Sequence, residues 1–262
     1  MESVCDDLRN EHQALDTIVS ELTEQLWSAP TPAEGWSVRD QISHLWFFDQ
    51  RALLAMLDAE TFATDLNWMV ANGGTAASVV PGRAMTGAML LDAWRRDREA
   101  LVAVARSIDP SARVPWYGPA MAARSFVTAR LMETWAHGQD VVDALGTSRP
   151  STARLKHVAH IGVRARPFSY LVNRLAMPES SVHVVLTAPD GSLWEWGAPA
   201  ADSVSGPALD FCLLVTQRRH LADTRLVMVG PAANEWMSIA QAFAGSAGGG
   251  RVPGQFGPIT GR

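Results

Sequence analysis

Three residues in two widely separated segments carry the side chains of a candidate metal site. His44 lies in SVRDQISHLW, and Glu133 and His137 lie in METWAHGQD. A carboxylate and an imidazole four residues apart project from the same side of a helix. Two imidazoles and one carboxylate suit zinc in a catalytic site, where a fourth position remains for water or substrate, and the same set can hold Fe(II). If the fold brings the two segments together, these residues form a metal centre with open positions.

Periodic apolar residues predict four long helices that would position these ligands. The predicted helices cover residues 4–27, 37–58, 86–107 and 122–145. Ser37 and Asp40 have the spacing of a capping box, which predicts the start of the second helix and places His44 about two turns inside it. Antiparallel helices with a metal between facing members are a known bundle arrangement. Residues 61–81, between the second and third helices, are expected to be partly helical.

Each ligand also has a purely structural interpretation. The last of the four helices carries a polar stripe roughly opposite an apolar one, and the polar stripe consists of Arg130, Glu133, His137 and Asp140. Periodicity alone predicts that this stripe faces water, because a Glu and a His one turn apart form an ordinary exposed pair. His44 is surrounded by apolar neighbours, so a core histidine that bonds a backbone carbonyl is an equal alternative to a ligand. Asp40 and Asp140 are candidates to orient an imidazole as hydrogen-bond acceptors, or to serve as capping or exposed carboxylates.

Other polar residues are weaker candidates for chemistry. His157 and His160 share a helical face at a spacing of three, but no carboxylate lies near them in the sequence. Arginines of the C-terminal half could bind an anionic substrate through bidentate contacts. These arginines are Arg164, Arg166, Arg218 and Arg219. The two cysteines, Cys5 and Cys212, do not have the spacing of a disulfide framework or a CxxC pair, and neither has the electropositive, accessible setting of a reactive thiol.

The second half of the chain predicts a small α+β unit. A helix over 152–174 is followed by two strands over 181–188 and 192–197 with a PDG turn between them. A helix over 208–219, a strand over 224–229 and a helix over 233–244 complete the unit. The predicted domains are therefore a helical bundle over 1–148, an α+β domain over 149–245 and a flexible Gly- and Pro-rich tail over 246–262.

Composition narrows the class of function. The 262 residues are 47% apolar and 19% charged, as in an ordinary globular protein, and the net charge of −5 argues against nucleic-acid binding. No apolar run approaches the roughly 20 residues of a membrane span, and the N-terminal segment lacks the pattern of a secretory signal. We therefore expect a cytoplasmic protein with small-molecule partners.

Several segments resemble the mycothiol-dependent maleylpyruvate isomerase family, within the wider DinB/YfiT-like metal-binding superfamily. The resemblance lies in GWSVRDQISHLWFFDQRAL and LMETWAHGQDVVDALG, and extends to DFCLLVTQRRHLADT and NEWMSIAQAFAG. It implies an α+β fold, with an N-terminal DinB-like four-helix bundle and a smaller C-terminal α+β domain. It also implies that His44, Glu133 and His137 hold a divalent metal, usually zinc, and that the thiol cosubstrate is mycothiol. An arginine of the C-terminal domain contributes to isomerase activity in this family, and Arg219 and Arg218 are the candidates here.

The function implied is a metalloenzyme that activates mycothiol for attack on a small electrophile, as an S-transferase or an isomerase. A metal lowers the pKa of a coordinated thiol, and the thiolate is the nucleophile. Two alternatives remain at this stage. One is a thiol-independent hydrolase, in which the metal activates water. The other is a protein that binds a metal or ligand without catalysis.

Overall fold

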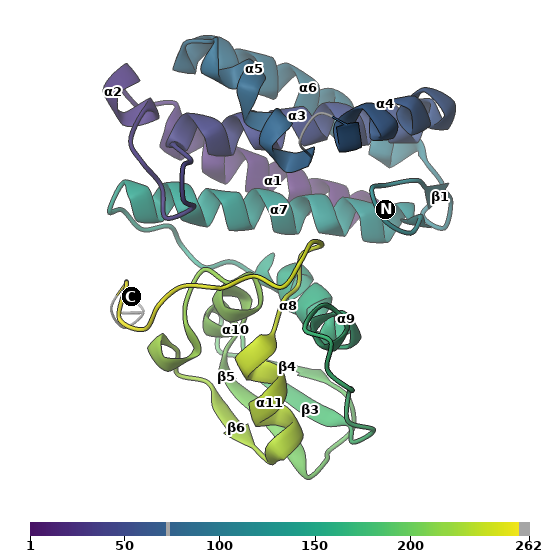
Figure 1. Ribbon diagram of the computed structural model, residues 1–262, viewed down its shortest axis with the longest axis vertical. Coiled ribbons are helices and arrows are strands. Elements are labelled where there is room, and N and C mark those ends of the chain that lie inside the picture. The colour runs from purple at the N-terminus through teal and green to yellow at the C-terminus, as the bar shows by residue number, and fades with distance from the viewer. Residues whose placement is uncertain (72–73, 257–262) are drawn as a thin grey trace. The chain divides into compact units, whose positions relative to one another are not determined.

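The computed structural model describes residues 1–71 and 74–256, which divide into two compact units, Met1–Arg149 and Pro150–Arg262. The first unit is helical and the second is mixed (Figure 1). The predicted α+β class is confirmed. The last six residues of the predicted tail lie outside the described residues. Within residues 246–256, the backbone amides of Gly248 and Gly254 donate hydrogen bonds to Gln241 and Asp223.

Four long helices form the body of the first unit. They are α1 (Glu2–Val19), α3 (Val38–Leu57), α6 (Gly87–Ser107) and α7 (Ala123–Ala144). Both α1 and α3 pack against α6 and α7, which is the arrangement of a four-helix bundle. Shorter elements join them: α2 (Glu24–Trp27), α4 (Ala59–Ala71), η1 (Gly74–Val79), α5 (Val80–Arg83), β1 (Arg113–Val114) and β2 (Met121–Ala122). One end of the bundle core contains Leu15, Trp27, Ile42, Leu45, Leu90, Trp94 and Val141.

Local sequence signals set the start of the helix that carries His44. Ser37 and Asp40 form the predicted capping box at the N-terminus of α3, with the Ser37 amide donating to Asp40 at 2.8 Å. The Thr86 side chain likewise caps α6 by accepting from the amide of Met89. These caps satisfy amides that have no partner inside the helix. The predictions for α3, α6 and α7 are confirmed to within about two residues at each end.

Two predicted helices are each divided in the structure. The helix expected over 4–27 ends at Val19, and Thr23 starts α2 by accepting from the amide of Leu26. The helix expected over 152–174 is split into α8 (Leu155–Arg164) and α9 (Arg166–Val172). Pro167 lies in the first turn of α9, where its missing N–H is harmless, whereas in the interior of a continuous helix it would clash with the preceding turn.

The second unit contains a four-stranded sheet in the order β4, β3, β5, β6. Its strands are β3 (Val182–Thr187), β4 (Leu193–Trp196), β5 (Asp202–Pro207) and β6 (Val227–Val229). The β3 and β4 strands form the predicted hairpin, while β3 and β5 are parallel and β5 and β6 antiparallel. Two helices, α10 (Ala208–Val215) and α11 (Pro231–Ile239), pack on the sheet.

The sequence reading missed β5, because its sequence DSVSGP contains one β-branched apolar residue together with Gly and Pro. Tertiary contacts stabilise the strand. Its first residue, Asp202, accepts hydrogen bonds from the amides of Ala232 and Ala233 at the start of α11. Gly230 is required beside it, since its φ is 83° and an added Cβ would lie 2.3 Å from Oδ1 of Asp202.

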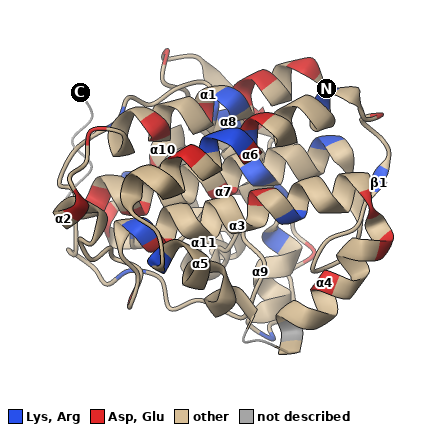
Figure 2. Ribbon diagram, turned by 90° about the horizontal axis from the view of Figure 1, so that it is seen from above, with Lys and Arg blue, Asp and Glu red and all other residues tan. Residues whose placement is uncertain are grey.

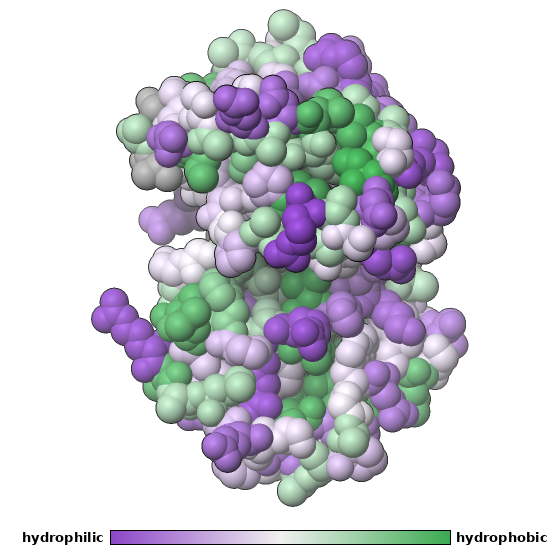
Figure 3. Space-filling model, turned by 90° about the vertical axis from the view of Figure 1, so that its right-hand side faces the viewer, coloured by the Kyte–Doolittle hydropathy of each residue, from purple (hydrophilic) through white to green (hydrophobic). Residues whose placement is uncertain are grey.

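The surface is mixed in charge and polarity. Acidic and basic residues are intermixed over the helices in Figure 2, and some of them form cross-helix ion pairs such as Arg95 with Asp16. Hydrophilic and apolar residues are interspersed over the face in Figure 3. In the part of the chain that the structure describes, no helix is long and apolar enough to cross a bilayer.

Candidate metal centre

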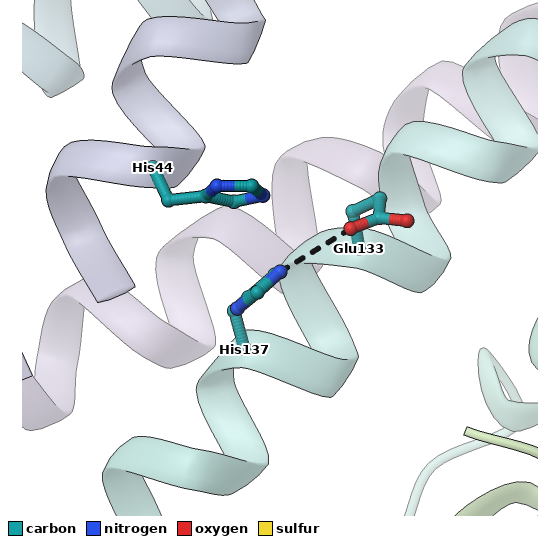
Figure 4. Close-up of side chains that lie close together, drawn as sticks. All are labelled: His44, Glu133 and His137. Carbon is teal, nitrogen blue, oxygen red and sulfur yellow. Dashed lines mark ion pairs between the residues drawn. The ribbon is translucent and has the colours of Figure 1, made fainter. Parts of the chain in front are cut away.

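The bundle brings His44, Glu133 and His137 together. His44 projects from α3, and Glu133 and His137 project from successive turns of α7 toward it (Figure 4). One ligand atom from each residue lies within 4.8 Å of the others. Nε2 of His137 is 3.3 Å from Oε2 of Glu133, and the two imidazole centroids are 4.3 Å apart. Donors about 2.0–2.2 Å from a tetrahedral zinc ion are about 3.4 Å apart, so small side-chain rotations would complete the set.

Each histidine is held at its Nδ1 atom by a polar side chain. Nδ1 of His44 lies 2.9 Å from the hydroxyl of Ser78, which is on η1. Nδ1 of His137 lies 2.6 Å from Oε1 of Gln41, which is on α3. In each residue Nε2 is the ring nitrogen on the far side from this contact. Ring nitrogens held in this way are characteristic of imidazoles that bind a metal.

Glu133 is poised as an anionic ligand. Burial opposes its ionisation, yet the hydrogen bond and charge of His137, with the charges of Arg130 and His44, outweigh burial and lower the pKa of Glu133 to about 2. Its side chain keeps 27% of its surface exposed, against 13% for His137. The carboxylate is therefore ionised at neutral pH while a part of the site remains accessible.

Aromatic rings surround the two imidazoles. Trp36, in the loop before α3, stacks on His137 at 5.9 Å with an interplanar angle of 14°, and also contacts His44 at 5.1 Å. Phe48 packs against His44 at 4.6 Å and touches Tyr117. These rings restrict the rotamers of both histidines and lower the local polarity, which strengthens electrostatic interactions inside the site.

The polar stripe of α7 does not face water as periodicity alone predicted. Arg130 and Asp140 are 4% and 1% exposed, and Arg130 pairs with the fully buried Asp49 of α3 at 2.9 Å. Glu133 and His137 are only partly exposed, because partners of the stripe come from another helix of the bundle. Nδ1 of His44 contacts the hydroxyl of Ser78, so the alternative interpretation of a satisfied core histidine has a side-chain partner on η1.

The residues that hold the imidazoles differ from those expected. Asp40 serves as the N-cap partner of Ser37 and pairs with Arg83 at 2.7 Å, so its carboxylate is directed away from the role of orienting His44. Gln41 and Ser78 were missed. Gln41 precedes His44 by three residues and could have been noticed on that face of the helix, but Ser78 lies 34 residues from its partner and no local pattern connects them.

The remaining predicted residues lie mostly in the second unit. Arg218 and Arg219 follow α10, where Arg218 donates to the carbonyl of Thr216 and Arg219 lies over the ring of Phe256. Arg166 donates to the carbonyls of Ser180 and Pro178, and Arg164 is exposed.

On α8, His160 accepts from the indole N–H of Trp196. Within residues 1–71 and 74–256, the trio on α3 and α7 is the one metal-compatible cluster of three or more His, Cys, Asp or Glu, and His157 and His160 belong to no other.

Both cysteines are fully buried and unlinked. Burial raises the pKa of the Cys212 thiol far above its usual range, and burial also raises that of Cys5. The reactive thiolate form is therefore disfavoured at both positions.

The chain resembles known proteins in both sequence and structure. Residues 8–142 match the sequence model of the mycothiol maleylpyruvate isomerase N-terminal domain. Uncharacterized proteins from two strains of Mycobacterium tuberculosis, CDC 1551/Oshkosh and H37Rv, are each 45% identical over 248 residues, covering 94% of this chain and 96% of the relative.

Solved structures extend the likeness to the fold of both units. The crystal structure of the mycothiol-dependent maleylpyruvate isomerase superposes with a TM-score of 0.58 at 16% identity, covering 87% of this chain and 92% of that one. A histidine-to-alanine mutant of that enzyme gives 0.57 at 15% identity, over 83% and 89% of the two chains. The family match spans more than half of the sequence and includes all three candidate ligands. The chain therefore belongs to the mycothiol maleylpyruvate isomerase family.

Proposed function

We propose that this protein is a metal-dependent enzyme that activates the thiol of mycothiol for attack on a small electrophile, as an S-transferase or an isomerase. The observation that carries the proposal is the convergence of His44, Glu133 and His137 within 4.8 Å in a chain of this family. A divalent ion bound by these residues, with zinc as first choice, would lower the pKa of a thiol at its open position. The external thiol is needed because Cys5 and Cys212 are buried.

The ligands, the aromatic residues and the arginines would each have a separate role in this reaction. His44 and His137 would supply neutral nitrogen donors, and the carboxylate of Glu133 would offset one of the two positive charges of the ion. One positive charge then remains to favour an anionic sulfur. Trp36 and Phe48 pack on the imidazoles and limit the approach of water beside them. We further propose that the bundle over 1–148 carries the metal and that Arg218 or Arg219, in the domain over 149–245, binds an anionic group of the substrate.

Two outcomes are chemically balanced. In transfer, the thiol loses its proton to solvent, sulfur forms a bond to the electrophilic carbon, and the leaving group departs with its bonding electrons. In isomerisation, the thiolate adds to one carbon of a double bond that is conjugated to a carbonyl, and the carbonyl oxygen takes up the displaced electron pair. The resulting single bond rotates, the electron pair returns to re-form the double bond, and the carbon–sulfur bond breaks to release the thiolate. Mycothiol is consumed in the first case and regenerated in the second. We place this chemistry in the cytoplasm, where low-molecular-weight thiols are kept reduced.

The first test is metal analysis of the purified protein followed by an assay of mycothiol consumption with a panel of electrophiles. We expect about one divalent ion per chain and conjugation that depends on mycothiol. His44→Ala should lose the metal and the conjugation together, whereas Cys5→Ala and Cys212→Ala should keep both. Full conjugation by a demonstrably metal-free His44→Ala protein would refute the proposal. Turnover of an ester or amide without any added thiol would favour a hydrolase instead.

A further inference from the structure

The hydrogen bonds around the two histidines determine which ring nitrogen carries a proton. The hydroxyl of Ser78 has a single proton and lies 2.6 Å from the carbonyl oxygen of Thr75, which can only accept. With its proton donated there, the Ser78 oxygen is an acceptor toward Nδ1 of His44 at 2.9 Å. Nδ1 of His44 must therefore be the N–H donor of this pair. The neutral ring then has its lone pair on Nε2.

A longer chain of hydrogen bonds gives the same result for His137. The hydroxyl of Thr31 donates its proton to the carbonyl of Trp36 at 2.8 Å. The Thr31 oxygen must therefore accept from Gln41, so the group of Gln41 that lies 2.9 Å away is the amide NH2. The other end of this amide, the carbonyl oxygen Oε1, then faces Nδ1 of His137 at 2.6 Å. Because Oε1 can only accept, Nδ1 of His137 is also protonated.

Burial makes both assignments costly to reverse. Ser78 and Gln41 are fully buried, and His44 is 7% exposed. Moving the proton from Nδ1 to Nε2 would place two acceptors at hydrogen-bond distance from each other. Otherwise the hydroxyl of Ser78 or of Thr31 would have to reverse its direction and leave a backbone carbonyl without its donor. Leaving a buried polar group unsatisfied costs about 1–3 kcal/mol. At both histidines, the surrounding structure therefore stabilises a protonated Nδ1. Nε2 of His137, which lies 3.3 Å from Oε2 of Glu133, is then the nitrogen that exchanges its partner for the metal.

We propose that Ser78 and Gln41 are positioning residues that fix His44 and His137 as Nδ1–H tautomers, so that both present Nε2 to the metal. The inference rests on the proposed function, because the metal is what gives the tautomer its use. It assigns the choice of nitrogen to Ser78 on η1 and Gln41 on α3. Their own partners, Thr75, Thr31 and Trp36, lie outside the helices that carry the ligands.

The direct test is long-range nitrogen NMR of the metal-free protein with ¹⁵N-labelled histidine, assigned through the single variants at positions 44 and 137. We expect Nδ1 of both residues to carry a proton and to keep it when zinc is added, with the zinc-induced change in chemical shift falling on Nε2. A bare Nδ1 on either histidine in the metal-free protein would overturn the inference. This readout does not depend on activity.

Zinc affinity, measured by competition with a chelator, tests the role of the two residues. Ser78→Ala and Gln41→Leu should each weaken zinc binding by about 10–100-fold. Gln41→Glu keeps an acceptor oxygen toward Nδ1 and should retain the Nδ1–H tautomer and an affinity close to that of the wild type. Unchanged affinity in folded Ser78→Ala and Gln41→Leu proteins would overturn the positioning role.

Matched controls separate this effect from general loss of packing. Thr134→Ala removes another fully buried hydroxyl, which donates to the carbonyl of Arg130 within α7. Gln139→Leu removes another buried amide of α7, which bonds Asp143. Both should bind zinc within about threefold of the wild type. If the wild type binds zinc but conjugates no thiol, the proposed function fails and the tautomer assignment stands. If the wild type binds no zinc, the metal site fails while the NMR result still decides the tautomers.

Discussion

Asp49 on α3 and Arg130 on α7 form a buried ion pair, with 2.9 Å between Oδ1 of Asp49 and Nη2 of Arg130. The other carboxylate oxygen of Asp49 accepts from the indole N–H of Trp94 on α6 at 2.9 Å. Asp49 lies on the same helix as His44, and Arg130 lies one turn before Glu133. The pair therefore joins the two helices that carry the candidate metal ligands.

Breaking this pair from one side should be strongly destabilising. Arg130→Met leaves the Asp49 charge buried with the Trp94 N–H as a remaining donor, so we expect a loss of about 3–5 kcal/mol in the free energy of unfolding. Urea unfolding of the purified variant measures it. The control is the exposed pair of Arg9 and Glu99, where Glu99→Gln should cost less than about 1 kcal/mol. A similar small cost for Arg130→Met would contradict the structural role given to the pair.

Metal binding should stabilise the folded protein, because the three ligands converge only in the native bundle. Zinc at about 100 times its Kd should add about 2.7 kcal/mol, and a chelator should remove that gain. Thermal unfolding with zinc and with chelator measures the difference. Glu133→Gln and His44→Ala should reduce or abolish the zinc-dependent shift, while His160→Ala, in the second unit, should keep it. The same shift in His44→Ala as in the wild type would show that zinc binds elsewhere.

Acid should destabilise the bundle through His12 of α1. Burial lowers its pKa to about 4, with Arg98 and Arg130 acting in the same direction and Asp49 opposing them. Neither ring nitrogen has a hydrogen-bond partner among the described residues. The histidine is thus neutral when folded and binds its proton more readily when unfolded, where its pKa is about 6.5. The contribution of His12 to the free energy of unfolding is fully present above pH 6.5 and is lost as the pH falls to about 4.

The size of this loss is about 3 kcal/mol, at 1.36 kcal/mol for each unit of the pKa difference. Denaturant unfolding at several pH values between 7 and 4 measures it, with His12→Leu as the comparison. Between pH 7 and 4, the free energy of unfolding of His12→Leu should fall by about 3 kcal/mol less than that of the wild type. Parallel pH dependences in the two proteins would show that His12 titrates normally when folded.

Gly82 in α5 allows the segment that carries Ser78 to approach α3 closely. Its amide donates to the hydroxyl of Ser43 at 3.1 Å, and an added Cβ would lie 2.4 Å from Cβ of Ser43. Gly82→Ala should therefore cost about 1–3 kcal/mol in unfolding free energy and weaken zinc binding by displacing Ser78 from His44. Gly118→Ala, where an added Cβ meets nothing within 4 Å, is the control. Wild-type stability in Gly82→Ala would mean that the contact relaxes without strain.

Local patterns were sufficient for the elements on which the ligands lie. The capping box of Ser37 and Asp40 marked the start of α3, and the apolar periodicity marked α6 and α7, because caps and periodicity act over a few neighbouring residues. The same kind of reasoning failed at β5, whose sequence DSVSGP is a poor strand former. That strand forms because it pairs with β3 and β6, and such pairing is a property of the assembled sheet.

The residue types and spacing in the sequence determined that Glu133 and His137 share one face of a helix and that they suit a metal. Whether that face met water or the core depended on Asp49, 81 residues before Arg130, and on Gln41, 96 residues before His137. Contacts over such separations leave no periodic trace in the sequence, because each forms only when whole helices pack. The tertiary structure alone therefore decided that the polar face of α7 is largely buried, that His44 meets it, and that Ser78 and Gln41 contact the two imidazoles.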